Sequence, residues 1–144
     1  MDIKLQTAES RIIYALIAKG TKPLVWYSNF TGIFDQFCIG YLKNIGPGAS
    51  AAIKSDEYMI FYINSDNITY LIMTDHRYPK EAAIWFLESI KKEFSSTYHY
   101  EFTDGPNFCL NSEFQTKLRM KFDYFNANKD VSIESIGILK EQMN

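Results

Sequence analysis

Basic clusters, long apolar runs and cysteines are scarce in this 144-residue chain, and each scarcity excludes a class of protein. The 15 Lys and Arg residues are outnumbered by 17 Asp and Glu, and no basic block stands out. This balance argues against nucleic acid as a partner. No apolar run approaches the ~20 residues of a membrane-spanning helix. Because residues 1–10 also lack the apolar stretch of a signal peptide, we expect the chain as given to be soluble.

Few side chains are placed for catalysis or metal binding. Cys38 and Cys109 are far apart in apolar surroundings, which favours reduced core thiols, with a disulfide as the alternative. His76 and His99 have no Cys or carboxylate partner at ligand spacing, which argues against a metal site. The stretch 46–48, Gly-Pro-Gly, lacks the Lys-Ser/Thr pair of a phosphate loop. We therefore predict no cofactor and no enzymatic activity.

Apolar residues, in contrast, are plentiful and periodic. They make up 47% of the chain, enough for the packed core of one domain. Their spacing predicts strands at 12–18, 24–27, 51–55, 58–63 and 68–74. It predicts helices from 28–31 to about 44, from 79 to about 97, and from 111 or 112 to about 125. Short connections between consecutive strands predict a mostly antiparallel sheet whose faces are covered by helices.

The segment from Tyr70 to Phe94 runs from a buried strand through a turn into an amphipathic helix. Pro79 is predicted at the first helical position, where its missing N–H costs nothing. Asn111 or Ser112 is predicted to cap the third helix. The Tyr70–Phe94 segment contains a packing surface without a catalytic motif, which favours a binding module over an enzyme.

The first predicted helix has a wide apolar surface. Its apolar residues span an arc of roughly 180°, more than a helix on one sheet needs. If the sheet covers one half of this arc, Phe34, Cys38 and Leu42 lie near the boundary. The excess is then either covered by loops or forms a hydrophobic groove beside the weak strand 51–53, open to a peptide.

Trp85 is the second unusual feature. On the second predicted helix it lies about 200° from Ala83, on the face that carries Glu88 and Lys92. A tryptophan on a polar face is a candidate surface contact. The alternative is partial cover by a neighbouring loop.

Several segments in order resemble the longin domain of vesicle R-SNAREs. They are Ile13–Thr21, Tyr78–Lys80, Phe86–Phe94 and Asn111–Phe114. The helix start Asn111–Phe114 is most similar to vesicle-associated membrane proteins of late endosomal and lysosomal routes, with other long-chain R-SNAREs as relatives. The resemblance covers roughly residues 9–128.

The resemblance implies an α+β, profilin-like fold with a five-stranded antiparallel sheet, one helix on one face and two on the other. It implies a non-catalytic regulatory domain that binds its own SNARE motif or trafficking adaptors. Both ligands are expected in a groove between the first helix and the third strand. Carried over by position, the groove residues are Phe34, Cys38, Leu42, Ala51 and Ile53. Ala51 is smaller than the leucine expected there, which bears on affinity more than on location.

The resemblance also accounts for the tail. We expect a longin domain over 1–128, then a hinge and the start of a SNARE helix over 129–144. Ile136, Leu139 and Met143 have 3–4 heptad spacing. The remaining heptads, which would pair with Q-SNAREs, and a membrane anchor are expected beyond Asn144. The full-length protein is then expected on the cytoplasmic face of vesicles or endomembranes.

An alternative function is a stand-alone longin-like subunit of a tethering or coat complex, which would need no heptads after Asn144. A small hydrolase or transferase would need a polar pocket at strand ends. No constellation of residues in the sequence supports that third class.

Overall fold

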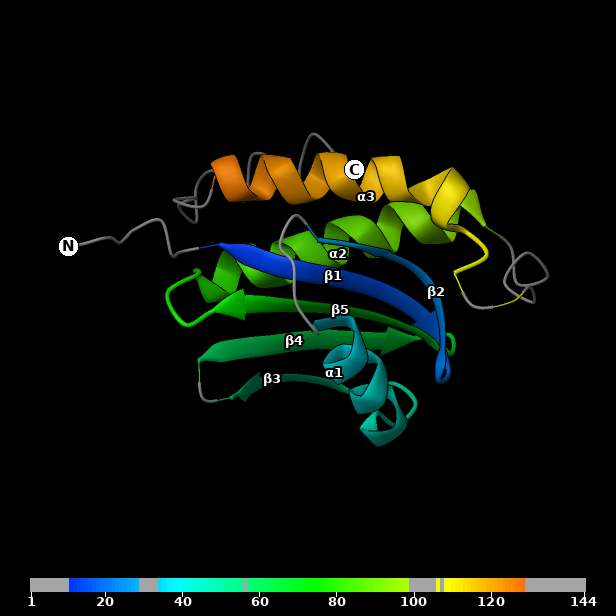
Figure 1. The fold of residues 1–144 in the computed structure, drawn as a ribbon, viewed down its shortest axis with the longest axis horizontal. Helices are drawn as coiled ribbons and strands as arrows, with labels where there is room; N and C mark the ends of the chain where they lie inside the picture. The colour runs from blue at the N-terminus through cyan, green and yellow to red at the C-terminus, as the bar shows by residue number, and fades with distance from the viewer. Residues whose placement is uncertain (1–10, 29–33, 56, 99–105, 107, 129–144) are drawn as a thin grey trace.

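A computed structural model describes residues 11–28, 34–55, 57–98, 106 and 108–128 (Figure 1). Its strands are β1 Ile12–Lys19, β2 Lys22–Tyr27, β3 Ser50–Lys54, β4 Tyr58–Ser65 and β5 Ile68–Asp75. Its helices are α1 Phe34–Tyr41, α2 Lys80–Thr97 and α3 Asn111–Ala127, and a 3₁₀ turn, η2 Leu42–Asn44, extends α1. The five strands form one antiparallel sheet in the order β2-β1-β5-β4-β3. The predicted α+β class and element order are confirmed.

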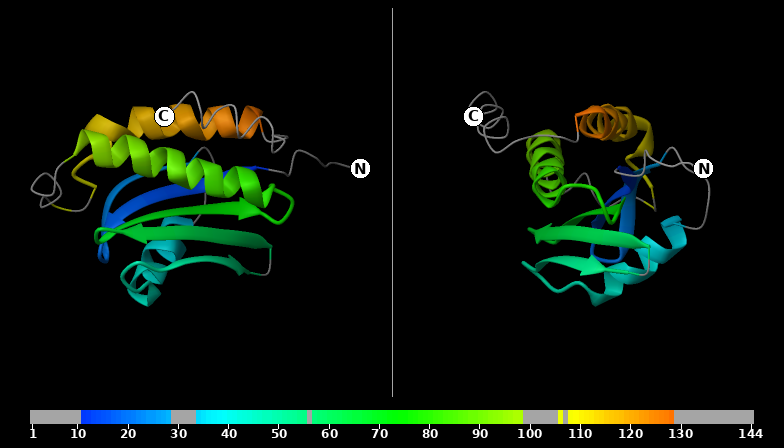
Figure 2. Two further views of the ribbon diagram at one scale, coloured as in Figure 1. Left: turned by 180° about the vertical axis from the view of Figure 1, so that it is seen from behind. Right: turned by 90° about the vertical axis from the view of Figure 1, so that its left-hand side faces the viewer.

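The sheet separates two apolar layers. Helices α2 and α3 lie side by side on one face, and α1 lies on the other (Figures 1 and 2). Alternate residues of β5 serve the two layers: Tyr70 and Ile72 pack toward α2 and α3, while Leu71 and Met73 pack toward α1. The buried residues under α2 and α3 are more numerous and include the rings of Phe86, Phe94, Phe114 and Phe122.

The hairpin between β4 and β5 has a two-residue turn. Its central residues Asp66 and Asn67 have φ of 55° and 66°, and Ser65 pairs with Ile68. Asp and Asn tolerate this left-handed conformation better than most residues, and two such residues match the twist of adjacent strands. The strands predicted at 58–63 and 68–74 are confirmed, and β4 extends to Ser65, next to the turn.

The turn from β5 into α2 is organised by Asp75. Its Oδ1 accepts the backbone N–H groups of Arg77 at 2.9 Å and Tyr78 at 3.1 Å. Pro79 is extended, with φ −60° and ψ 130°, and stands just before the first helical residue. The predicted start of the helix was therefore one residue early.

The start of α3 differs from the predicted cap. Leu110 holds the N-cap position without a side-chain hydrogen bond. The Asn111 Oδ1 instead accepts the Trp26 N–H at 3.1 Å, and the Gln115 amide donates to the Trp26 carbonyl at 2.7 Å. The Leu110 N–H donates to the Leu24 carbonyl at 3.0 Å. Asn111 is thus used to close the outer edge of β2, which explains why the capping prediction for Asn111 or Ser112 is wrong.

The end of α3 is fixed to the start of β1. The Asn126 side chain accepts the Ile12 N–H at 2.7 Å and donates to the Ile12 carbonyl at 3.1 Å. The Tyr78 hydroxyl donates to the Phe125 carbonyl at 3.0 Å. These contacts hold the end of α3 beside the start of β1 and the turn that precedes α2.

Candidate binding surface between α1 and β3

The side of α1 that faces the sheet carries Cys38 and Leu42. Their side chains are 0% and 2% exposed and pack among residues such as Leu16, Leu71 and Met73. The prediction that Cys38 and Leu42 line an open groove is therefore corrected, because both are core residues. Phe34 begins α1, but its side chain lies outside the described part of the structure.

The exposed flank of α1 carries the aromatic residues Phe37 and Tyr41. Phe37 is 47% exposed, and Tyr41, one helical turn later, is half-buried. The Tyr41 ring lies 6.1 Å from the ring of Tyr62 on β4, next to β3. A helical wheel shows the width of the arc but not which half the sheet covers. Phe37 was missed for this reason.

The two residues that the sequence analysis expected on the strand side, Ala51 and Ile53, share one face of β3. Ala51 and Ile53 point to the face that α1 covers and are half-buried, whereas Ser50, Ala52 and Lys54 are exposed. We define the α1–β3 surface as a band of apolar side chains from both elements and the connection between them. It consists of Phe37, Tyr41, Ile45, Ala51 and Ile53.

The two sheet edges differ in their hydrogen bonding. Along β3, the Ser55 N–H donates to the Tyr58 carbonyl and the Asn64 N–H donates to the Ala49 carbonyl, each at 2.8 Å. Because antiparallel pairs alternate, the backbone groups of Ser50, Ala52 and Lys54 point away from β4. Within the described ranges these outward groups have no hydrogen-bond partner. In the described part of the chain nothing pairs with the edge of β3, whereas α3 hydrogen-bonds along the edge of β2.

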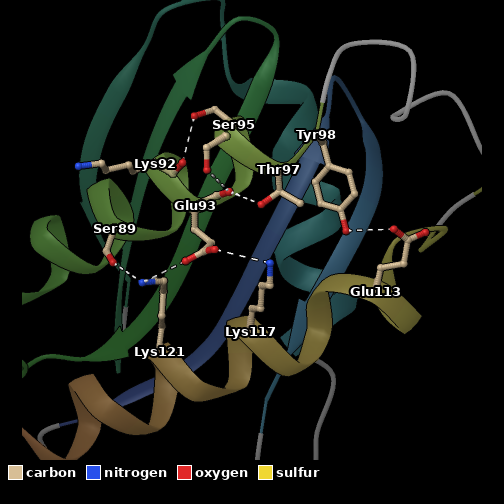
Figure 3. Close-up of polar contacts among 10 residues, drawn as sticks. Ser89, Lys92, Glu93, Ser95, Thr97, Tyr98, Glu113, Lys117 and Lys121 are labelled. Atoms are coloured by element: carbon tan, nitrogen blue, oxygen red, sulfur yellow. Dashed lines mark hydrogen bonds and ion pairs between the residues drawn. The ribbon is translucent and has the colours of Figure 1, made fainter. Parts of the chain in front are cut away.

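Trp85 is not a surface contact, since it is 7% exposed and belongs to the core under α2 and α3. Ser89 and Glu93 follow Trp85 at helical spacing and face α3. The Lys121 ammonium donates to the Ser89 hydroxyl at 2.8 Å and lies 3.8 Å from Glu93 (Figure 3). Lys117 lies 3.6 Å from the same carboxylate. The predicted polar face of α2 is therefore partly an interface with α3.

The chemistry of the α1–β3 surface is that of a contact surface. Burial raises the pKa of the Tyr41 hydroxyl, and the neighbouring Tyr62 adds to the rise. Within the described residues, no group of His, Cys, Asp and Glu is arranged to hold a metal, and neither Cys38 nor Cys109 forms a disulfide. The Nε2 of His76 lies 3.0 Å from the Ser55 carbonyl, and His99 lies outside the described residues.

The heptad positions Ile136, Leu139 and Met143 lie outside the described residues. Their assignment to a SNARE helix remains a prediction, as does the domain boundary at 128. None of the helices in the described part of the chain combines the length and apolar character needed to cross a membrane.

The fold and the exposed band beside an open sheet edge define a class of protein. The sequence profile of the longin family, described as a regulated-SNARE-like domain, matches residues 24–118. The chain belongs to the longin family, which confirms the resemblance seen in the sequence. This family is non-catalytic, in agreement with the prediction.

The relatives that the chain matches include vesicle-associated membrane proteins of the R-SNARE type. The chain is 27% identical to vesicle-associated membrane protein 714 of Arabidopsis thaliana, over 83% of this chain and 56% of that protein. It is 29% identical to vesicle-associated membrane protein 7 of Homo sapiens, over 82% of this chain and 54% of that protein. Vesicle-associated membrane protein 7B of Dictyostelium discoideum is 28% identical, over 86% of this chain and 48% of that protein. The chain spans about half the length of the curated relatives it matches.

Proposed function

We propose that this longin domain regulates membrane fusion by binding its own SNARE motif or a trafficking adaptor at the α1–β3 surface. The observation that carries the proposal is the coincidence of exposed apolar side chains with an unpaired strand edge. Phe37 and Ile53 offer apolar contact, and the outward backbone groups of β3 offer hydrogen bonds. Peptides commonly recognise sheet edges and apolar grooves in these two ways.

The mechanism is a shift between two populations. In the closed form the SNARE segment occupies the α1–β3 surface and is hidden from Q-SNAREs. An adaptor or a partner SNARE that binds one form more tightly than the other shifts the equilibrium between the closed and open forms. The size of the shift is set by the difference between its two affinities. The domain therefore controls SNARE complex assembly and sorting without a chemical step.

The partners and location of the whole protein follow from its relatives as proposals. Because the matched relatives are vesicle-associated membrane proteins about twice as long, we place the remaining heptads and a membrane anchor after Asn144. The heptads pair with Q-SNAREs, and the domain then faces the cytoplasm on a vesicle or endosomal membrane. A reading frame without further heptads would favour the stand-alone subunit of a tethering or coat complex.

Calorimetric titration tests the proposed surface. The probe is a peptide that starts at Ile136 and continues through the heptads of the full reading frame. Ile53→Ser removes apolar contact from a half-buried edge position, so we expect binding about tenfold weaker, equal to about 1.4 kcal/mol. Met120→Ser, at a 61% exposed position on α3, is the control and should bind like wild type.

Equal affinity for Ile53→Ser and Met120→Ser, with both variants folded, would remove the α1–β3 surface from the account. Leu42→Asp is unsuitable for this purpose, because Leu42 is a core residue and the substitution would test folding.

A further inference from the structure

A pocket lies at the end of the sheet where β1 ends and β5 begins, beside the C-terminal half of α2 (Figure 1). Its volume is about 620 Å³, which is within the range of pockets that hold small molecules. One wall is formed by the β4–β5 hairpin turn and the end of β1, and the other wall is formed by α2. We call it the α2–hairpin pocket.

The sheet wall of this pocket joins two turns that are distant in the sequence. Lys19 pairs with Ile68 across β1 and β5, so both side chains project from the sheet face that α2 covers. The Gly20 N–H donates to the Asn67 carbonyl at 3.2 Å. This bond holds the turn after β1 against the β4–β5 turn, and it fixes Lys19 at the rim of the pocket.

The helix wall follows from the spacing of residues on α2. Lys91, Phe94 and Ser95 occupy positions i, i+3 and i+4, so they share the side of the helix that faces the hairpin. Phe94 is buried, and its ring lies 6.0 Å from the ring of Tyr70 on β5. The α2–hairpin pocket therefore has an aromatic floor between two polar walls.

The floor also presents a hydroxyl group. Tyr70 lines the pocket although it is 2% exposed, and the hydrogen bonds among the described residues do not include its hydroxyl. Buried polar groups in folded proteins almost always have a hydrogen-bond partner. The Tyr70 hydroxyl is therefore placed to donate to a ligand in the pocket.

The lining carries more positive than negative charge, in a chain whose net charge is -2. Lys19 lies on the sheet wall and Lys91 on the helix wall, while Asp66 is the acidic residue of the lining. Lys91 is 3.9 Å from Glu88, an ion pair that engages one N–H of its ammonium group and leaves others for a ligand. Burial raises the pKa of the Tyr70 hydroxyl, and the charge of Asp66 adds to the rise. We therefore expect the pocket to favour an anion, and Asp66 to weaken that preference.

We propose that the α2–hairpin pocket binds a phosphate ester through Lys19 and Lys91, with the carbon skeleton of the ester against Ile68 and Phe94. Ammonium and hydroxyl donors from both walls and the floor suit the several oxygens of a phosphate better than the two oxygens of a carboxylate. The pocket is larger than a bare phosphate ion, which favours a ligand with a carbon skeleton. A lipid headgroup and a soluble phosphate ester share this chemistry.

This site goes beyond the proposed function and is independent of it. The α2–hairpin pocket lies on the α2 face of the sheet, whereas the α1–β3 surface lies on the α1 face. A phosphate ester and a SNARE segment therefore do not compete for the same residues. Ile53→Ser should leave binding of the phosphate ester unchanged, so failure of one proposal is distinguishable from failure of the other.

NMR titration of the ¹⁵N-labelled 144-residue chain with inositol trisphosphate tests the pocket. We expect saturable shifts of the Asn67 and Ser95 amides. Lys91→Gln should bind about tenfold more weakly, because it removes a charge-assisted hydrogen bond. Tyr70→Phe keeps the ring and removes the hydroxyl, so binding should weaken about threefold. Asp66→Asn removes the opposing charge and should tighten binding about threefold.

Lys92→Gln is the matched control, because it removes the same charge at the next position of α2, which does not line the pocket. At about 0.15 M salt, charges more than about 8 Å away are largely screened, so this variant should bind like wild type. Unchanged shifts of the Leu71 amide in β5 report that each variant is folded. Equal weakening in Lys91→Gln and Lys92→Gln, or no saturable shift of Asn67 and Ser95, would overturn the proposal.

Co-sedimentation with vesicles identifies the source of the phosphate. Vesicles of phosphatidylcholine alone are compared with vesicles that also contain phosphatidylinositol bisphosphate. Binding to the second kind that is lost in Lys91→Gln assigns a lipid headgroup. Saturable binding of inositol trisphosphate without vesicle binding assigns a soluble phosphate ester.

Discussion

At the scale of single residues, the environment of a side chain depended on which neighbour covers it. Trp85 stands among charged residues on a helical wheel, yet it is buried in the core under α2 and α3. Cys38 and Phe37 are adjacent in an apolar arc, yet one is buried and the other is 47% exposed. The sequence drew attention to Trp85 and to the wide apolar arc of the first helix, but it did not single out Phe37. The covering neighbour could not be predicted, because it belongs to an element distant in the sequence.

The burial of Trp85 leads to a stability prediction. Trp85→Ala leaves a large cavity in the core under α2 and α3, so the free energy of unfolding should fall by about 3–5 kcal/mol. Ile84→Ala, at the preceding and more exposed position, should cost less than about 1 kcal/mol. Urea unfolding monitored by far-UV circular dichroism measures both. Equal and small losses would mean that Trp85 lies at the surface after all.

Tyr98 leads to a pH prediction. Partial burial, followed by the charge and hydrogen bond of Glu113, raises the pKa of Tyr98 from 10.0 to about 12. The folded state therefore keeps this proton longer than the unfolded state, and the resulting stability is lost as pH rises from about 10 to about 12. Tyr98→Phe should make the decline in the melting temperature over this range shallower. Tyr124→Phe, at an exposed tyrosine, is the matched control, and the same slope in both variants would contradict the assignment.

At the scale of elements, α3 determines which edge of the sheet remains available. Along β2 it supplies Asn111 and Gln115 to both backbone groups of Trp26. No helix in the described residues hydrogen-bonds to the outer backbone groups of β3. Lys54 is the one charged side chain of that strand. Local sequence predicted Asn111 as a cap because its side chain satisfies a helix N–H in most contexts. A strand 85 residues earlier in the sequence provides the competing donor, which local reasoning does not reveal.

Removing the Asn111 side chain should destabilise the outer edge of β2. In Asn111→Ala the Trp26 N–H loses its acceptor, and the free energy of unfolding should fall by about 1–3 kcal/mol. The Trp26 amide should also exchange faster with solvent. Ser112→Ala, at the next and exposed position, should change neither quantity. An unchanged Trp26 exchange rate in Asn111→Ala would show that the edge is closed by other means.

At the scale of the whole molecule, the sequence was sufficient for the architecture. The periodicity of strands such as 58–63 and of the helix beginning near Pro79 predicted the element order, and the resemblance predicted the layers. Such patterns are local, so one sequence reveals them. The candidate surface was predicted only on the strand side, at Ala51 and Ile53, because strand alternation fixes which residues share a face. The side of α1 that faces the sheet depends on packing against strands distant in the sequence, so Cys38 and Leu42 were predicted at the boundary although they are buried.

The central claim is that the α1–β3 surface receives the SNARE segment, and chemical-shift mapping tests it most directly. The ¹⁵N-labelled domain is titrated with the SNARE peptide of the full reading frame, and amide shifts are followed residue by residue. We predict that the largest changes fall on Phe37, Ala51 and Ile53, while Trp26 on the closed edge stays unchanged. Changes centred on β2 and α3, or none at saturating peptide, would contradict the account.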